Sequence, residues 1–181
     1  FHTVSRRRTL PRPVSAVRPL FETVTALLDE LDIGARQVRL VGVSVSGAGV
    51  GTEVLCDPVV HFGALAALYF NAVPRFVDIE PDTYLMDPDS LRANITPDAR
   101  AVIVTHLWGQ PARIDEIRAI CDEHGLFLIE DCAHAIGTRW KGQHVGTFGD
   151  LGMFSFQEFK QLSTGDGAML TCRDPALAEK M

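Results

Sequence analysis

The feature that most constrains the fold is an alternation of short apolar strands and helical segments that begins after Gly51. The pattern predicts helices at 61–72 and 88–94, and a third helix through Ile114 and Ile117 that Gly125 closes. Strands alternating with helices build βαβ units around a mostly parallel sheet, so we predict a three-layer α/β domain. Strands are expected at 53–56, 75–79, 101–105, 126–129, 153–156 and 168–171, with a hairpin at 140–145.

The first 47 residues have a different character. They hold seven arginines and four acidic residues, a net charge of +3, whereas residues 48–181 carry a net charge of −9. An extended arginine-rich segment, a helix and a β-branched strand indicate a small α+β segment, and the glycine-rich stretch 46–51 resembles a linker. We therefore predict two domains, 1–47 and 48–181, the first being the better candidate for binding a polyanion. The alternative is that Arg6, Arg7 and Arg8 lie on a solvated strand.

Composition excludes several classes of protein. With 181 residues and 46% hydrophobic content the chain can build a core without disulfides. No apolar run approaches the roughly 20 residues of a membrane span, and Pro11 and Pro13 interrupt the place where a signal peptide would be apolar.

The four cysteines form no CxxC pair, so we expect no metal site and favour reduced, buried thiols over two disulfides, in a cytoplasmic protein. The first residue is Phe1, which indicates a piece of a longer chain.

Two places in the sequence could carry chemistry. Ligands of open α/β sheets bind at the carboxyl ends of the strands, where Asp131 follows one buried strand and Lys160 lies four residues after another. Pyridoxal phosphate needs a Schiff-base lysine and an acidic partner for its pyridinium nitrogen, and these two residues could provide both. Taken alone, Asp131 could instead cap a turn and Lys160 could be a surface lysine.

Motifs around these residues resemble a known family. The stretches 129–137 and 149–156, and Lys160 followed by Thr-Gly-Asp-Gly at 164–167, resemble the sugar aminotransferases of the DegT/DnrJ/EryC1/StrS family, which are fold-type-I pyridoxal phosphate enzymes. The resemblance covers about residues 50–181 and would make this region part of the large domain of such an enzyme. Further matching stretches lie at 53–58, 71–78 and 106–111.

The resemblance implies a role for each of five residues. Lys160 would form the Schiff base with pyridoxal phosphate and move protons, and Asp131 would pair with the pyridinium nitrogen. His134 would contact the edge of the cofactor, Ser155 would bind its phosphate, and Phe62 would stack on its ring. The alternatives are a core aromatic for Phe62, a turn-bracing histidine for His134 and a strand hydroxyl without a ligand for Ser155.

The implied activity is amino transfer from an amino acid, glutamate or glutamine, to a keto sugar that is often nucleotide-linked. Family members are homodimers. Three departures qualify this expectation: Gln157 stands where many members have histidine, the phosphate-binding turn and helix that normally precede the strand at 53–56 have no room, and the sequence stops at Met181 where the family continues. A fragment without activity is therefore an alternative.

Residues 1–47 resemble a different family. The stretches 3–11, 27–31 and 38–47 resemble the end of the little-finger domain of Y-family DNA polymerases of the DNA polymerase IV type, which would place Arg6, Arg7 and Arg8 near the DNA backbone. A DNA-backbone-binding module is thus the competing function. The two resemblances meet at 46–51, so we hypothesise a joined sequence, either a rearranged gene or an artefact of assembly. Resequencing the codons for 40–60 tests the second version.

Overall fold

The computed structural model describes residues 51–179. Expectations for the basic N-terminal segment, including Arg6, Arg7 and Arg8, lie outside the described residues. Within 51–179 no helix is long and apolar enough to cross a membrane.

A six-stranded sheet forms the centre of the described region, with strand order β2-β1-β3-β4-β7-β8. The first five strands are parallel, and β8 pairs with β7 in the antiparallel direction. The expected mostly parallel sheet is confirmed. Its strands are β1 (Glu53–Cys56), β2 (Val73–Phe76), β3 (Ala99–Thr105), β4 (Phe127–Asp131), β7 (Leu151–Ser155) and β8 (Ala168–Cys172).

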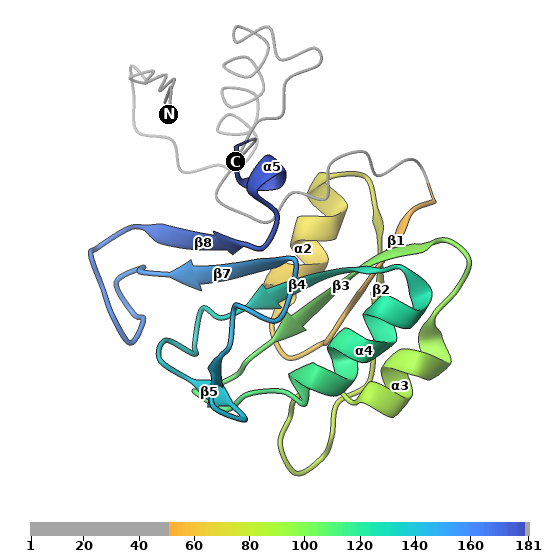
Figure 1. Ribbon diagram of the computed structural model, residues 1–181, viewed down its shortest axis with the longest axis horizontal. Coiled ribbons are helices and arrows are strands. Elements are labelled where there is room, and N and C mark those ends of the chain that lie inside the picture. The colour runs from red at the N-terminus through yellow and green to blue at the C-terminus, as the bar shows by residue number, and fades with distance from the viewer. Residues whose placement is uncertain (1–50, 180–181) are drawn as a thin grey trace, which may run out of the picture. The chain divides into compact units, whose positions relative to one another are not determined.

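Helices cover both faces of this sheet. Figure 1 shows α3 (Pro88–Asn94) and α4 (Ile114–His124) together on one side and α2 (His61–Tyr69) on the other. The core divides accordingly, because Leu128 of β4 packs in one apolar cluster with Ile117 of α4, while its neighbour Ile129 packs in the other with Ala64 of α2. This is the predicted three-layer arrangement. A separate hairpin of β5 (Arg139–Trp140) and β6 (Gln143–His144) follows β4, and α5 (Pro175–Ala178) follows β8.

Several boundaries differ from the sequence-based expectation, and three of the elements concerned are informative. The helix predicted at 61–72 ends at Tyr69, because Asn71 adopts a left-handed conformation (φ 58°). The strand predicted at 75–79 begins at Val73 and includes Pro74, which is tolerated because β2 is an edge strand and needs fewer backbone donors. The strand predicted at 126–129 continues to Asp131, so Asp131 belongs to the strand rather than following it.

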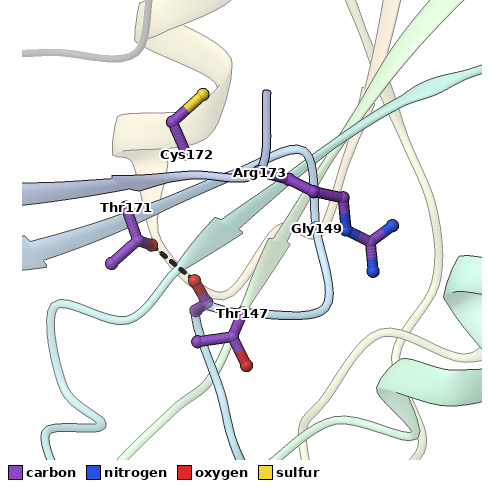
Figure 2. Close-up of a pocket in the computed structure, with 6 residues that line it drawn as sticks. Thr147, Gly149, Thr171, Cys172 and Arg173 are labelled. Atoms are coloured by element: carbon purple, nitrogen blue, oxygen red, sulfur yellow. Dashed lines mark hydrogen bonds between the residues drawn. The ribbon is translucent and has the colours of Figure 1, made fainter. Parts of the chain in front are cut away.

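Glycines allow the chain to pass closely at β7. A side chain at Gly152 would overlap the carbonyl oxygen of Gly146 and the hydroxyl of Thr171, which donates a hydrogen bond to that carbonyl. Gly146 and Thr171 line a small pocket shown in Figure 2, together with Thr147, Gly149, Cys172 and Arg173. Cys172 pairs with Leu151 at the start of β7, so this pocket lies at the opposite end of that strand from Ser155.

The cysteines are unpaired, as the sequence indicated. Cys56, Cys121 and Cys132 are buried and Cys172 is half-buried, and none forms a disulfide. Burial raises the pKa of Cys56 and of Cys121 to about 12, so both thiols stay protonated at neutral pH.

Candidate active site

The candidate site lies where the carboxyl ends of the central parallel strands meet. Thr105 ends β3 and pairs in register with Asp131, which ends β4. Asp131 also pairs with Met153 of β7, two residues before Ser155. Asp57 directly follows β1 on the other side of β3. Because parallel strands share one carboxyl edge, polar side chains distant in sequence converge there.

Glu130 and Asp131 are adjacent in β4, and their side chains point to opposite faces of the sheet. Successive side chains of a strand alternate, and Ile129 packs on the face that carries α2. Asp131 therefore points to the α2 face, and Glu130 points to the face that carries α3 and α4. The two residues are neighbours in the sequence, but the structure places them in separate environments.

Asp131 is almost fully buried, with 5% of its surface exposed. Its Oδ1 atom accepts a hydrogen bond of 2.9 Å from the backbone N–H of Ala133. Burial raises the pKa of the Asp131 carboxyl, and the Ala133 N–H and positive charge on His134 and Lys160 oppose that rise. A further cation beside Asp131 would therefore stabilise its charged carboxylate.

His134 and Lys160 share this electrostatic environment. Burial lowers the pKa of His134, the charge of Lys160 lowers it further, and Asp131 acts in the opposite direction. The Nδ1 atom of His134 is buried and has no hydrogen-bond partner among the described residues. The structure therefore brings together three residues that the sequence singled out, and it leaves one of them with an unused polar atom.

Lys160 is carried by the connection between β7 and β8. Its side chain is half-buried and its backbone N–H donates to the carbonyl of Gln157 at 2.9 Å. Ser155, the last residue of β7, is also half-buried, and its Oγ accepts a long hydrogen bond of 3.4 Å from the N–H of Gln157. The chain between Ser155 and Lys160 therefore forms a tight turn at the sheet edge.

Phe62 lies near the start of α2 and is 58% exposed. Its ring centroid is 4.2 Å from that of His61. The alternative that Phe62 is a core aromatic is thus wrong for the described region. Its stacking on a cofactor stays a prediction.

Asp57 is a further buried acid at this edge, and no sequence motif pointed to a role for it. This residue is 2% exposed, and its Oδ2 accepts a 2.8 Å hydrogen bond from the N–H of Thr105. Its Oδ1 is buried and unpartnered among the described residues. Burial raises the pKa of Asp57, and the nearby Asp131 carboxylate raises it further. An acidic residue directly after a buried strand was the available clue.

Glu130 also had no assigned role, and it organises the other face. Its Oε2 accepts hydrogen bonds from Gly146 N–H at 2.7 Å and His106 Nε2 at 3.0 Å, and its Oε1 accepts from Phe148 and Gly149 N–H at 2.7 and 2.6 Å. Burial would raise the pKa of Glu130, but these donors outweigh it and hold the pKa below its usual value.

The tautomer of His106 follows from its partners. Its Nδ1 accepts a hydrogen bond from the N–H of Ala112 at 3.1 Å, so the proton of the neutral ring lies on Nε2 and is donated to Glu130. His106, Glu130 and Cys132 are close enough to bind a metal ion together. Hydrogen bonds account for the positions of His106 and Glu130 without a metal ion, and burial raises the pKa of the Cys132 thiol.

Comparison with known proteins decides the family. Residues 38–181 match the model of the DegT/DnrJ/EryC1/StrS aminotransferase family. The chain belongs to this family. Residues 1–54 match a second model, the impB/mucB/samB family C-terminal domain, which agrees with the resemblance to Y-family polymerases. The two matches overlap at 38–54.

Individual relatives support the assignment. Protein MosB of Rhizobium meliloti is 52% identical over 118 residues, 65% of this chain and 23% of MosB. An L-glutamine:2-deoxy-scyllo-inosose aminotransferase of Streptomyces kanamyceticus is 41% identical over 143 residues, 78% of this chain and 34% of the relative. The crystal structure of the aminotransferase TlmJ from Streptoalloteichus hindustanus superimposes with a TM-score of 0.72 at 39% identity, covering 74% of this chain and 37% of TlmJ. The chain spans 23% to 37% of the length of these relatives.

The residues present fit the cofactor that aminotransferases generally use. Pyridoxal phosphate has a ring nitrogen that carries a proton, a phosphate and an aldehyde that reacts with an amine. A buried carboxylate at Asp131, a half-buried amine at Lys160 and the unpartnered Nδ1 of His134 lie together at the sheet edge. This combination, most directly the unused buried nitrogen of His134, is what a family member with a cofactor site should show.

Proposed function

We propose that this family member contributes to pyridoxal phosphate-dependent transfer of an amino group from glutamine or glutamate to a keto sugar. The observation that carries the proposal is the electrostatic grouping of Asp131, His134 and Lys160 at the carboxyl ends of β4 and β7. When bound, pyridoxal phosphate supplies an electron sink next to the carbon from which a proton is removed.

Each residue has a distinct task in this proposal. Lys160 binds the cofactor covalently through Nζ and afterwards holds or moves the proton. Asp131 accepts the proton-bearing ring nitrogen as its partner, which offsets the cost of burying a carboxylate. Ser155 Oγ donates to the phosphate, His134 Nδ1 acquires the polar partner it lacks, and the exposed ring of Phe62 stacks on the cofactor.

The substrate class rests on the relatives. One is named for glutamine and 2-deoxy-scyllo-inosose, and another, from Acidithiobacillus ferrooxidans, is named a UDP-N-acetyl-3-dehydro-alpha-D-glucosamine 3-aminotransferase and is 44% identical over 135 residues. We therefore propose a keto sugar or keto cyclitol as acceptor, free or nucleotide-linked. We also propose a homodimer, which the resemblance to this family implies.

Borohydride trapping tests the cofactor site directly. The protein is mixed with pyridoxal phosphate, reduced with borohydride and digested, and the labelled peptides are measured by mass spectrometry. We expect label on Lys160, since its charge acts on the buried Asp131 carboxyl, and little on Lys141, whose ammonium is paired with Asp115 Oδ2 at 2.5 Å. Lys160→Ala should lose the specific label, and equal labelling of Lys141, Lys160 and Lys180 would contradict the proposal.

A second candidate function rests on the match of residues 1–54 to the impB/mucB/samB C-terminal domain. The candidate is binding of duplex DNA through phosphate contacts by Arg6, Arg7 and Arg8. Its test is the affinity for duplex DNA at several salt concentrations, for the wild type and a triple Arg→Ala variant. Each arginine that contacts a phosphate should contribute about 0.9 to the slope of log affinity against log salt. If the slope is unchanged in the variant, these arginines do not contact the DNA phosphates.

A further inference from the structure

The segment that carries Lys160 has few ties to the rest of the domain. It leaves the sheet after Ser155 and returns at Ala168. Most of its hydrogen bonds stay within the connection itself: Lys160 N–H to Gln157 carbonyl at 2.9 Å, Phe159 N–H to Gln157 Oε1 at 3.0 Å, and Thr164 N–H to Phe156 carbonyl at 3.0 Å. Such bonds shape the segment but do not fix its distance from β4.

One hydrogen bond from this segment reaches the loop after β4. The side chain of Gln161, the residue after Lys160, accepts the N–H of Ile136 through Oε1 at 3.0 Å. Ile136 lies two residues after His134. Among residues 51–179, no other hydrogen bond joins segment 157–166 to a residue outside 155–167.

The amide group of Gln161 also meets the loop after β3. Its Nε2 lies 3.7 Å from the position that a side-chain carbon at Gly109 would occupy. Gly109 has a φ of 80°, and its carbonyl accepts a hydrogen bond of 3.1 Å from Thr138 Oγ1. Gln161 therefore packs where the loops after β3 and β4 are already joined to each other.

We propose that Gln161 is a positioning residue that holds the Lys160 segment against the loop containing His134. The consequence for the cofactor rests on the proposed function, whereas the tether itself does not. Because Lys160 and Gln161 are adjacent, loss of the tether lets the lysine amine move away from Asp131. A single hydrogen bond of this kind changes an equilibrium by about 3- to 10-fold, which sets the size of the expected effects.

Three variants separate the tether from general packing. Gln161→Leu keeps a side chain of similar length and removes the acceptor. Gln161→Glu keeps an oxygen that can accept from Ile136 N–H and is the rescue variant. Gln143→Leu is the matched control, because Gln143 is also exposed and its Nε2 donates to Thr147 Oγ1 at 3.0 Å on the β5–β6 hairpin.

Two measurements need no cofactor. Amide hydrogen exchange at Ile136 should be about 3- to 10-fold faster in Gln161→Leu. It should return to the wild-type rate in Gln161→Glu and be unchanged in Gln143→Leu. The second measurement is the rate at which trinitrobenzenesulfonate modifies Lys160, relative to Lys141 in the same sample. This ratio should change by about 3- to 10-fold in Gln161→Leu and stay at the wild-type value in Gln161→Glu and Gln143→Leu. Unchanged exchange at Ile136 in Gln161→Leu would overturn the tether.

A third measurement connects the tether to the cofactor. The rate of borohydride trapping of pyridoxal phosphate at Lys160 should fall by about 3- to 10-fold in Gln161→Leu and recover in Gln161→Glu. Faster exchange at Ile136 with unchanged Lys160 modification and trapping would make Gln161 merely structural and overturn the positioning role. If the wild type shows no trapping at all, the proposed function fails, and the relative modification of Lys160 still decides whether Gln161 positions it.

Discussion

Glu130→Gln is expected to lower the free energy of unfolding by about 3–5 kcal/mol, the cost of breaking a buried charged network. Glu130 is fully buried and its two oxygens face four donors: Gly146, Phe148 and Gly149 N–H and the Nε2–H of His106. An amide offers one oxygen and one NH2 group. Whichever way it is turned, a donor faces two donors, and buried N–H groups lose their partners.

The effect should depend on pH in a defined direction. The folded state holds the pKa of Glu130 below its unfolded value, so its stabilising contribution is complete above the unfolded pKa. That contribution is lost as the pH falls through the folded pKa. The difference between wild type and Glu130→Gln should therefore be largest near neutral pH and shrink in acid.

Urea denaturation followed by circular dichroism measures this difference. The matched control is Glu123→Gln, because Glu123 forms an exposed ion pair with Arg92 at 2.6 Å and its replacement should change the midpoint little. Equal midpoints for Glu130→Gln and Glu123→Gln would show that the Glu130 network does not stabilise the loop 146–149.

The sequence predicted the architecture because the information is local. Apolar runs such as 101–105 and the spacing of Ile114 and Ile117 define each element within a few residues, and alternating elements imply a parallel sheet. Candidate residues followed for the same reason, since Asp131 lies at a strand end and Lys160 just beyond another. Lys160, Asp131 and His134 lie close enough in the structure to affect one another's charge, while the cofactor-binding roles of all five residues stay predictions.

What the sequence could not provide depends on contacts between distant residues. Glu130 and Asp131 are neighbours in sequence. Because β4 extends to Asp131, their side chains point to opposite faces of the sheet, and the sequence did not show that the strand continues so far. The donors for Glu130 come from 16 to 24 residues away, and the partner of Asp57 lies 48 residues away. A buried carboxylate with such partners looks the same in a sequence as an exposed one.

Asp131→Asn is expected to impair catalysis and stabilise the protein at the same time. Asparagine keeps an oxygen for the Ala133 N–H but carries no charge. Because burial raises the pKa of Asp131 in the folded state, ionising this carboxyl opposes folding at pH values above its unfolded pKa. Without cofactor, the variant should gain on the order of 1 kcal/mol of stability at neutral pH. The gain should vanish below the unfolded pKa, where both states are protonated.

The same charge is needed once a cationic ring nitrogen lies beside it. Removing one preorganised electrostatic partner from a reacting centre typically costs about 10²–10³ in rate. We therefore expect Asp131→Asn to keep borohydride trapping at Lys160, which needs only the amine, but to slow the glutamine-dependent absorbance change of the bound cofactor by that factor. Asp57→Asn is the matched control, because Asp57 is a second buried carboxylate of the same edge that the proposal does not place on the ring nitrogen. Equal slowing in both variants would remove the specific role of Asp131. A stability gain without slowing would mean that its burial serves another purpose.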